Sequence, residues 1–313
     1  MNVVFLGTSS FAVPSLELLD ASAHRVRLVV TRPDRPRGRG RETTPAPIAD
    51  AAKKLDLDVF RPERVNAPEA VARIRAAEPD LIVVVAYGQI LGKELLSLAP
   101  QGIVNLHGSL LPAYRGAAPI ARAVQDGLLD TGVSLQFVAA ELDSGDVIDK
   151  EPVAIGPDET AGELTERMAP IAARLLARNL DKLARGTAPR ERQAAAAVTW
   201  APPLKKTEGR IPWTLPAHRV HAHIRAMTPW PGAFTEWPRA TGPLERLIVR
   251  TAEVRRGGAN VPPGTVVRSD GVLDVATADG LIRIERLLRS GKRETDAESF
   301  LNGLPIPLGA VFR

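Results

Sequence analysis

The chain has 313 residues, of which 44% are hydrophobic and 25% are charged, and these proportions are typical of a globular protein. It contains no cysteine, so disulfides, thiolate metal sites and cysteine nucleophiles are excluded. Its longest apolar run, residues 81–87, is far shorter than the ~18 residues of a membrane-spanning helix, and a net charge of +5 favours acidic partners only where the charges cluster.

The first half of the chain alternates apolar, strand-like runs with helical segments. The run at 3–7 begins almost at the first residue and lacks the basic start and cleavage site of a signal peptide, so we expect a cytoplasmic protein. Strands this uniformly apolar are usually covered on both faces, as in parallel sheets with helical crossovers. We therefore predict a doubly wound α/β domain with a mostly parallel, Rossmann-like sheet. The predicted strands are 3–7, 25–31, 80–87, 102–107 and 131–138, and the predicted helices are 11–19, 45–55 and 160–183.

Positive charge is concentrated in residues 32–41, which include five arginines and one aspartate. Proline and glycine between the arginines predict a loop rather than a helix face. Because this loop follows the strand at 25–31, it should emerge at the carboxyl edge of the sheet. Guanidinium groups suit phosphate, although a solvated surface is the commoner use of such a run.

The stretch NLHGSLLPAYRG, residues 105–116, ends an apolar strand with polar side chains. Residues two apart in a strand project to the same side, so Asn105 and His107 should point together. Gly108 ends the strand and places the pair at the carboxyl edge, where open α/β sheets bind ligands. A carboxamide donor and an imidazole at one point could stabilise an oxyanion and transfer a proton.

Asp143 could add a carboxylate to this pair. The strand at 131–138 leads into LDSGD, which should bring Asp143 to the same edge. Amide, imidazole and carboxylate suit acyl transfer to a nitrogen nucleophile, and the lack of cysteine and of a G-x-S-x-G elbow favours direct transfer. The residues alone leave a structural role open, because Asn-x-His pairs commonly end strands and Asp143, Gly145 and Asp146 could simply form a turn.

The composition of the chain and its pattern of predicted elements change after residue 186. Residues 187–205 are polar, rich in alanine and interrupted by proline, which is typical of a linker. Beyond it, a helix is predicted at 216–225, and short strands then alternate with turn residues, which indicates a small β-barrel or sandwich. We therefore predict a catalytic domain at 1–186, a linker at 187–205 and a second domain at 206–313. The predicted strands of the second domain are 247–254, 264–269, 271–280 and 281–288.

Several motifs, in order and spacing, resemble the methionyl-tRNA formyltransferase family over nearly the whole chain. They are FLGTSSFAVPSLELL, RPDRPRGRGR, VVVAYGQIL, GIVNLHGSLLPAYRGAAPI, ELDSGDVI, TWAPPLKKTEGRIPW and IRAMTPWPGAF. The resemblance implies that Asn105, His107 and Asp143 are the catalytic residues, that 10-formyltetrahydrofolate is the co-substrate, that no metal takes part and that the second domain is OB-like. The folate-binding residues that it implies are Ser109, Leu110, Leu111, Pro112, Tyr87 and Gly88.

The same resemblance implies that the acceptor is initiator methionyl-tRNA. In the family the arginine loop enters the acceptor end of the tRNA, and we expect a monomer with no membrane contact. The expected tRNA-binding residues are Arg35, Arg37, Arg39, Arg41, Lys205 and Lys206, and Lys292 with Arg293 forms a second basic pair.

The sequence leaves two other functions to consider. A formyl-folate enzyme could act on a small amine, such as a sugar nucleotide or glycinamide ribonucleotide, but the arginine loop and the second domain argue against it. A non-catalytic RNA-binding protein would have no need of the three catalytic residues. A metal site at His218, His221 and His223 is disfavoured because His223 would leave the helix face that the other two share, and FLGTSSF lacks the G-x-G-x-x-G pattern of a dinucleotide site.

Overall fold

The computed structural model describes residues 1–37, 42–238, 244–258 and 260–313, with only the backbone of residues 35–37 and 42–44. The chain forms two compact units. The first comprises residues 1–119, 130–154 and 165–202, and the second comprises residues 120–129, 155–164 and 203–313. None of the helices in the described part of the chain has both the length and the apolar character that crossing a bilayer requires.

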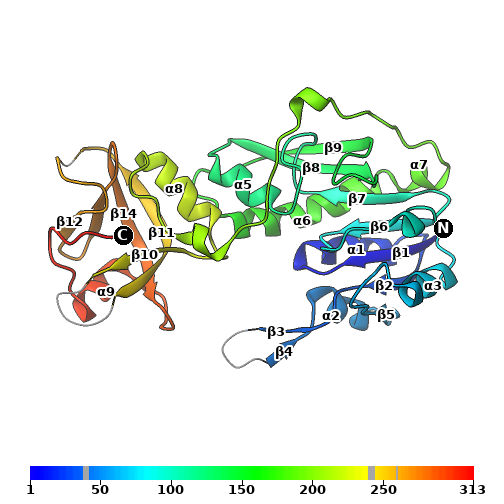
Figure 1. Cartoon of the computed structure of the whole chain (residues 1–313), viewed down its shortest axis with the longest axis horizontal. Helices are drawn as coiled ribbons and strands as arrows, with labels where there is room; N and C mark the ends of the chain where they lie inside the picture. Colours follow the sequence, from blue (N-terminus) through cyan, green and yellow to red (C-terminus); the bar gives the residue numbers. More distant parts are fainter. Residues whose placement is uncertain (38–41, 239–243, 259) are drawn as a thin grey trace. The chain divides into compact units, whose positions relative to one another are not determined.

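A seven-stranded sheet forms the centre of the first unit, in the order β5-β2-β1-β6-β7-β8-β9 (Figure 1). The strands from β5 to β7 pair in parallel, whereas β8 is antiparallel to both β7 and β9. The predicted doubly wound, mostly parallel sheet is confirmed. The strands are β1 (Asn2–Gly7), β2 (Arg25–Val30), β5 (Val59–Phe60), β6 (Leu81–Val85), β7 (Ile103–His107), β8 (Asp130–Phe137) and β9 (Val147–Ala154).

Helices connect the parallel strands, as crossover connections require. Both α2 and α3 begin at a proline, which suits the first helical position because its missing N–H has no partner there. The single helix predicted at 160–183 is in fact two, because the Asn179 side chain bonds the Leu175 carbonyl and the Asp149 carboxylate at the break. The helices are α1 (Val13–Asp20), α2 (Pro47–Lys54), α3 (Pro68–Ala76), α4 (Lys93–Leu96), α5 (Pro119–Gln125), α6 (Ala161–Ala177) and α7 (Leu180–Ala184).

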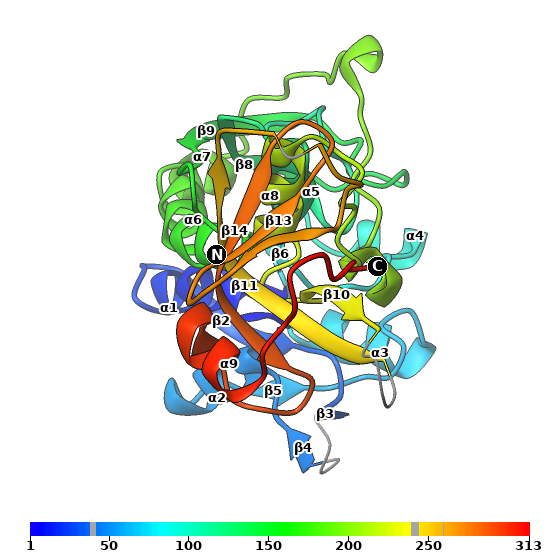
Figure 2. The ribbon, with the colours of Figure 1, turned by 90° about the vertical axis from the view of Figure 1, so that its left-hand side faces the viewer.

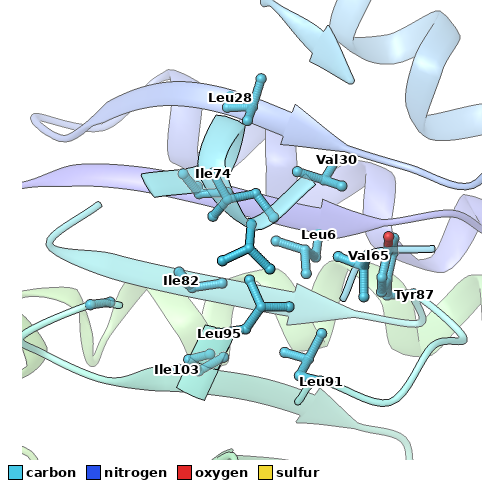
Figure 3. Packing of buried hydrophobic residues seen from close by; sticks show 13 residues of the cluster. Leu6, Leu28, Val30, Val65, Ile74, Ile82, Tyr87, Leu91, Leu95 and Ile103 are labelled. Atoms are coloured by element: carbon cyan, nitrogen blue, oxygen red, sulfur yellow. The ribbon is translucent and has the colours of Figure 1, made fainter. Parts of the chain in front are cut away.

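An apolar cluster packs α3 and α4 against the parallel strands (Figure 3). Val4 and Leu6 lie two residues apart on β1 and therefore face the same side. They belong to one cluster with Ile74 of α3 and Leu95 of α4, and all four side chains are buried. Full burial of such a side chain contributes about 1.5–3 kcal/mol. The cluster includes residues of β6 and β7, so it fixes the two strands that lead into the candidate site.

The arginine-rich segment differs from its prediction as a loop. Its described backbone forms a two-stranded antiparallel hairpin of β3 (Arg35–Arg37) and β4 (Glu42–Thr44). Asp34 anchors the base of this hairpin, because its carboxylate accepts from the backbone N–H of Ala46 at 3.3 Å and pairs with Arg61 at 3.4 Å. Backbone pairing across the segment was missed because proline and glycine weaken a strand pattern.

The second unit contains an antiparallel sheet in the order β10-β11-β14-β13-β12, with β15 beside β14. Figure 2 shows β11 and β14 as long, strongly twisted strands, which agrees with the predicted OB-like barrel. The strand β10 was missed because it is short and follows a proline-rich turn. The elements are α8 (Ala217–Ala226), β10 (Ala233–Trp237), β11 (Glu245–Arg255), β12 (Val266–Ser269), β13 (Leu273–Ala276), β14 (Leu281–Arg289), β15 (Thr295–Asp296) and α9 (Ala297–Gly303).

The three histidines of α8 have different surroundings. His218 is exposed, His221 lies 3.4 Å from the Asp158 carboxylate, and His223 is buried. Desolvation by burial lowers the pKa of His223 to about 4, although backbone hydrogen bonds to Gly209 and Arg210 oppose the shift. No group of three or more metal-ligating side chains occurs among the described residues.

The lowered pKa of His223 predicts a loss of stability in acid. The folded state resists protonation of His223, so its contribution is present above pH 6.5 and is lost as the pH falls from 6.5 towards 4. The slope is about 1.4 kcal/mol per pH unit. Urea unfolding at pH 7 and pH 5 should show that His223→Gln loses about 2 kcal/mol less stability than the wild type over this interval. The exposed control His218→Gln should behave like the wild type, and equal losses in all three proteins would contradict the prediction.

Candidate active site

Strand β7 presents the predicted amide and imidazole on one face. Asn105 and His107 alternate with Leu106, which is buried on the opposite face. In the register of the sheet, His107 lies opposite Ser134 and Asn105 lies opposite Gln136 of β8. These four side chains therefore share one face, and four polar groups gather within an otherwise apolar sheet.

The Asp143 carboxylate lies over this face of the sheet. Its Oδ1 accepts from Asn105 Nδ2 at 3.4 Å and from Gln136 Nε2 at 3.1 Å. Its Oδ2 accepts from the backbone N–H of Gly116 at 2.9 Å and lies 3.6 Å from His107 Nδ1. The structure therefore brings the three predicted catalytic side chains together.

Asp143 reaches the site by a different route from the one predicted. Because β8 is antiparallel to β7, its last residue Phe137 lies opposite the start of β7 and not at its carboxyl edge. The loop 138–146 turns back over the sheet and closes where the Phe137 N–H donates to the Asp146 carbonyl at 2.9 Å. Within it, Asp143 has a φ of 49°, and a Cβ on Gly145 would lie 1.9 Å from the Phe137 carbonyl oxygen. The conformation of this loop is therefore closely constrained, and it places the Asp143 carboxylate over the sheet.

Each nitrogen of the His107 imidazole faces a defined partner. Its Nε2 lies 2.8 Å from the Tyr114 carbonyl oxygen, and because a carbonyl only accepts, Nε2 carries a hydrogen. Nδ1 then faces the Asp143 carboxylate, which can hold a proton between the two groups. The side chains of His107 and Asp143 are only 6% and 10% exposed, so their interaction is little screened by water. The pair can accept and pass on a proton.

The predicted folate segment, residues 109–112, forms a turn that is fastened to β8. Ser134 Oγ accepts from the Leu111 N–H at 2.9 Å and donates to the Ser109 carbonyl at 2.7 Å. The side chains of Ser109 and Leu111 are buried, whereas Leu110 and Pro112 are half-buried. Of the four predicted residues, Leu110 and Pro112 therefore have side-chain surface left for a ligand.

Tyr87 and Gly88 follow the carboxyl end of β6. The Tyr87 ring belongs to the apolar cluster of Figure 3, and its backbone carbonyl accepts from Thr8 Oγ1 at 3.0 Å. Desolvation by burial raises the pKa of Tyr87 to about 12, against a smaller opposing effect of Arg32. Gly88 has a φ of 83°, which glycine adopts without strain. The side chain of Tyr87 thus supports the edge of the sheet from within the core.

The structure describes only part of the predicted basic set. Arg35 and Arg37 lie on β3, where only their backbone is described, and Arg39 and Arg41 lie outside the described residues. Lys205 and Lys206 are exposed in the second unit, where a short 3₁₀ turn (Lys206–Gly209) begins.

Two glutamines of the site were not singled out from the sequence. Gln136 could have been found, because Ser134 and Gln136 are polar residues two apart in an apolar strand. Gln193 could not, since it lies in the segment predicted as a linker. Its Nε2 donates to the carbonyls of Asp143 and Gly145, both at 2.8 Å.

Comparison with known families identifies both halves of the chain. Residues 1–180 match the model of the formyl transferase family, and residues 203–305 match that of the formyl transferase C-terminal domain. The chain is 42% identical to a methionyl-tRNA formyltransferase of Symbiobacterium thermophilum, with 100% of this chain and 95% of the relative covered. It is also 42% identical to that of Moorella thermoacetica, with 99% of each chain covered.

Solved structures with a similar fold include formyltransferases of small amines. An N-formyltransferase from Helicobacter canadensis, in complex with folinic acid and dTDP-3-aminofucose, aligns with a TM-score of 0.65 and 15% identity over 90% of this chain and 97% of the other. Glycinamide ribonucleotide transformylase 1 from Symbiobacterium toebii aligns with a TM-score of 0.52 and 21% identity over 62% of this chain and 93% of the other. At these identities the likeness concerns the fold.

Proposed function

The chain belongs to the formyl transferase family, and we propose that it transfers a formyl group from 10-formyltetrahydrofolate to methionyl-tRNA. The acceptor atom is the α-amine of methionine esterified to initiator tRNA. The observation that carries the proposal is the meeting of three side chains, since Asp143 lies 3.4 Å from the Asn105 amide and 3.6 Å from the His107 imidazole.

Asn105, His107 and Asp143 would each have a different role in direct formyl transfer. As the amine nitrogen bonds to the formyl carbon, the carbonyl electrons move to oxygen, where Asn105 Nδ2 donates to the developing oxyanion and His107 helps to stabilise the same charge. Asp143 accepts the proton that the amine loses. The bond from the formyl carbon to N10 then breaks, its electron pair leaves with N10, and N10 takes up a proton through His107. The Nδ1–Oδ2 separation of 3.6 Å allows the imidazole and carboxylate to exchange this proton after modest adjustment.

We assign the folate to the edge of the sheet beside the turn at 109–112. Leu110 and Pro112 would form an apolar wall for the folate. Tyr87 and Gly88 would form the boundary of the folate site at the end of β6. Structural neighbours support a folate co-substrate, because the N-formyltransferase from Helicobacter canadensis was solved with folinic acid and HypX from Aquifex aeolicus with tetrahydrofolic acid. No metal has a step in this chemistry.

The basic residues would bind the tRNA. The arginines of the segment 35–41, which are Arg35, Arg37, Arg39 and Arg41, would engage the acceptor-end phosphates, and Lys205 and Lys206 would bind the tRNA backbone from the second unit. In this proposal residues 1–186 form the catalytic domain, 187–205 the connection and 206–313 the OB-like tRNA-binding domain. The enzyme would act as a monomer in the cytoplasm, where charged initiator tRNA is used.

A comparison of acceptors tests the proposed function. Formylation by the wild type should be measured with methionyl-tRNA, with a dTDP-aminosugar and with glycinamide ribonucleotide, each with 10-formyltetrahydrofolate. Only methionyl-tRNA should be formylated efficiently. Serine at Arg35, Arg37, Arg39 and Arg41 together should lower kcat/KM for methionyl-tRNA strongly and for 3′-methionyl-adenosine little. A preference for either small amine would replace the proposed acceptor.

Binding to tRNA should also weaken steeply with salt. Each phosphate neutralised by Lys or Arg releases counterions, so log K should fall linearly with log salt concentration. Filter binding between 50 and 200 mM KCl should give a slope that becomes about one unit shallower for each basic residue removed from the phosphate contacts. The double variant Lys205→Gln, Lys206→Gln tests this for the second unit. A tRNA affinity that does not change with salt concentration would show that these basic residues do not bind the tRNA phosphates.

The loop that carries Asp143 should not tolerate a side chain at residue 145. In Gly145→Ala the new Cβ would lie 1.9 Å from the Phe137 carbonyl oxygen and 2.8 Å from its carbon, so the backbone must move. A displacement of about 1 Å at a catalytic group can cost roughly a hundredfold in rate. We expect kcat to fall by at least that factor, whereas Gly303→Ala, whose Cβ meets nothing within 4 Å, should retain normal turnover.

A further inference from the structure

The side chain of Gln193 contacts the loop 138–146, which carries Asp143. Its side-chain Nε2 donates to the backbone carbonyls of Asp143 and Gly145, both at 2.8 Å, and lies 3.2 Å from Gln136 Oε1. Its Oε1 accepts from both Nε and Nη2 of Arg115, at 3.0 and 2.7 Å. Because a guanidinium only donates, Arg115 fixes which end of the amide faces the loop. The orientation of the Gln193 amide is therefore fixed by the N–H donors of Arg115.

The loop needs such a support because its shape is an unusual one. Asp143 has a φ of 49°, in the left-handed region that non-glycine residues rarely adopt, and such a conformation persists only where the surroundings enforce it. Asp143 and Gly145 lie between β8 and β9, outside the paired strands, so their carbonyls need donors from elsewhere. Gln193 supplies one amide group to both carbonyls. It therefore fixes the backbone on either side of Ser144, directly beside the catalytic carboxylate.

The other end of the same network reaches the catalytic groups directly. The residues on either side of Arg115 contact the site: the Tyr114 carbonyl accepts from His107 Nε2, and the Gly116 N–H donates to Asp143 Oδ2. The backbone of Arg115 is itself held, with its N–H donating to the Thr199 carbonyl at 2.9 Å. Gln193 and Arg115 thus join the two backbone segments between which the imidazole and the carboxylate meet.

The segment that carries Gln193 is fastened to the same unit. The backbones of Glu191 and Val147 exchange two hydrogen bonds, at 2.8 and 2.9 Å, and the Ala201 N–H donates to the Arg115 carbonyl at 2.7 Å. Gln193 lies between these two attachments. Its position is therefore determined by backbone pairing on both sides, as a supporting residue requires.

We propose that Gln193 is a positioning residue for formyl transfer, holding the loop 138–146 so that the Asp143 carboxylate stays between Asn105 and His107. This inference rests on the proposed function. It predicts that the donors of Gln193, and not merely its contact with Arg115, are needed for turnover. A residue that only filled space or only neutralised Arg115 would not have that property.

The change Gln193→Glu separates these roles. A glutamate keeps an oxygen towards Arg115 but turns a second oxygen, without hydrogens, towards the carbonyls of Asp143 and Gly145. Gln193→Ala removes both contacts without adding repulsion. A matched control is Gln125→Ala, which removes a glutamine that also accepts from an arginine, Arg122, at 2.8 Å in α5. All variants are made in the full-length protein.

Two measurements decide the proposal. The first is hydrogen exchange by mass spectrometry of the free protein, which should be about tenfold faster in peptides covering 137–147 of Gln193→Glu and unchanged elsewhere. The second is steady-state formylation, where kcat should fall about a hundredfold in Gln193→Glu and less in Gln193→Ala, with KM for both substrates nearly unchanged. The pH profile of kcat should also move, because the carboxylate no longer faces the imidazole in the same way. Gln125→Ala should match the wild type in all respects.

The results that would overturn the role of Gln193 differ from the result that would overturn the proposed function. Normal exchange in 137–147 of Gln193→Glu, or fast exchange with normal kcat, would overturn the positioning role. A Gln193→Glu enzyme that is more active than Gln193→Ala would also overturn it, because the Arg115 contact would then be what matters. If the wild type does not formylate methionyl-tRNA, the proposed function fails, and the exchange experiment still decides whether Gln193 holds the loop.

Discussion

We expect Asn105→Ala to slow formyl transfer by about two to three orders of magnitude. Asn105 Nδ2 carries two hydrogens, and its bond to Asp143 at 3.4 Å uses one of them, so the other can meet the developing oxyanion. Loss of one such positioned donor typically costs about 3–4 kcal/mol of transition-state stabilisation. The effect should appear in the single-turnover rate constant at saturating substrates, with little change in the melting temperature.

A matched control for this variant lies in the second unit. Asn302 is exposed on α9, so Asn302→Ala removes the same group without touching the site. It should transfer formyl at the wild-type rate. An Asn105→Ala enzyme with near-normal turnover would remove Asn105 from the transfer step.

Asp143→Asn should lower kcat by about 10²–10⁴-fold, the range typical of a lost general base. The substitution also disturbs the network, because both carboxylate oxygens accept from donors, among them Gln136 Nε2 at 3.1 Å and the Gly116 N–H at 2.9 Å. The amide nitrogen of asparagine would have to face one of these donors. Rates measured between pH 6 and 9 should stay low throughout, because asparagine does not titrate.

The same change three residues along the chain provides the comparison. Asp146 lies in the same loop, and its carboxylate is 3.9 Å from Arg190, whereas the carboxylate beside the imidazole is that of Asp143. Asp146→Asn should leave kcat within about twofold of the wild type, as expected for a partly exposed pair. If Asp146→Asn were the more damaging change, the loop would matter for its fold and Asp143 would not be the base.

The sheet and the amide–imidazole pair could be predicted because they depend on local rules. Uniformly apolar runs indicated the mostly parallel sheet, and the two-residue period of a strand placed Asn105 and His107 on one face. The grouping with Asp143 was also correct, but the reason was wrong, because the direction of β8 is not encoded in its apolar pattern. An antiparallel β8 leaves Asp143 to a loop that folds back over the sheet.

The supports of the site could not be predicted from local patterns. Arg115 and Gln193 are 78 residues apart, and Gln193 lies in a segment whose alanine and proline content is typical of a linker. Its hydrogen bonds depend on where the segment runs across the folded unit, which no periodicity encodes. The hairpin of β3 and β4 was missed for a related reason, because pairing between short strands overrides the loop preference of proline and glycine.

Rapid-quench analysis of a single turnover, with the formyl carbon of 10-formyltetrahydrofolate labelled and enzyme in excess over methionyl-tRNA, asks directly whether the group moves in one step. We predict that label appears on methionine at the rate at which it leaves the folate, that none is found on the protein at any time, and that Asn105→Ala slows both processes equally. Label that accumulates on the protein before it reaches methionine, or that never reaches methionine, would contradict direct transfer between the side chains of Asn105, His107 and Asp143.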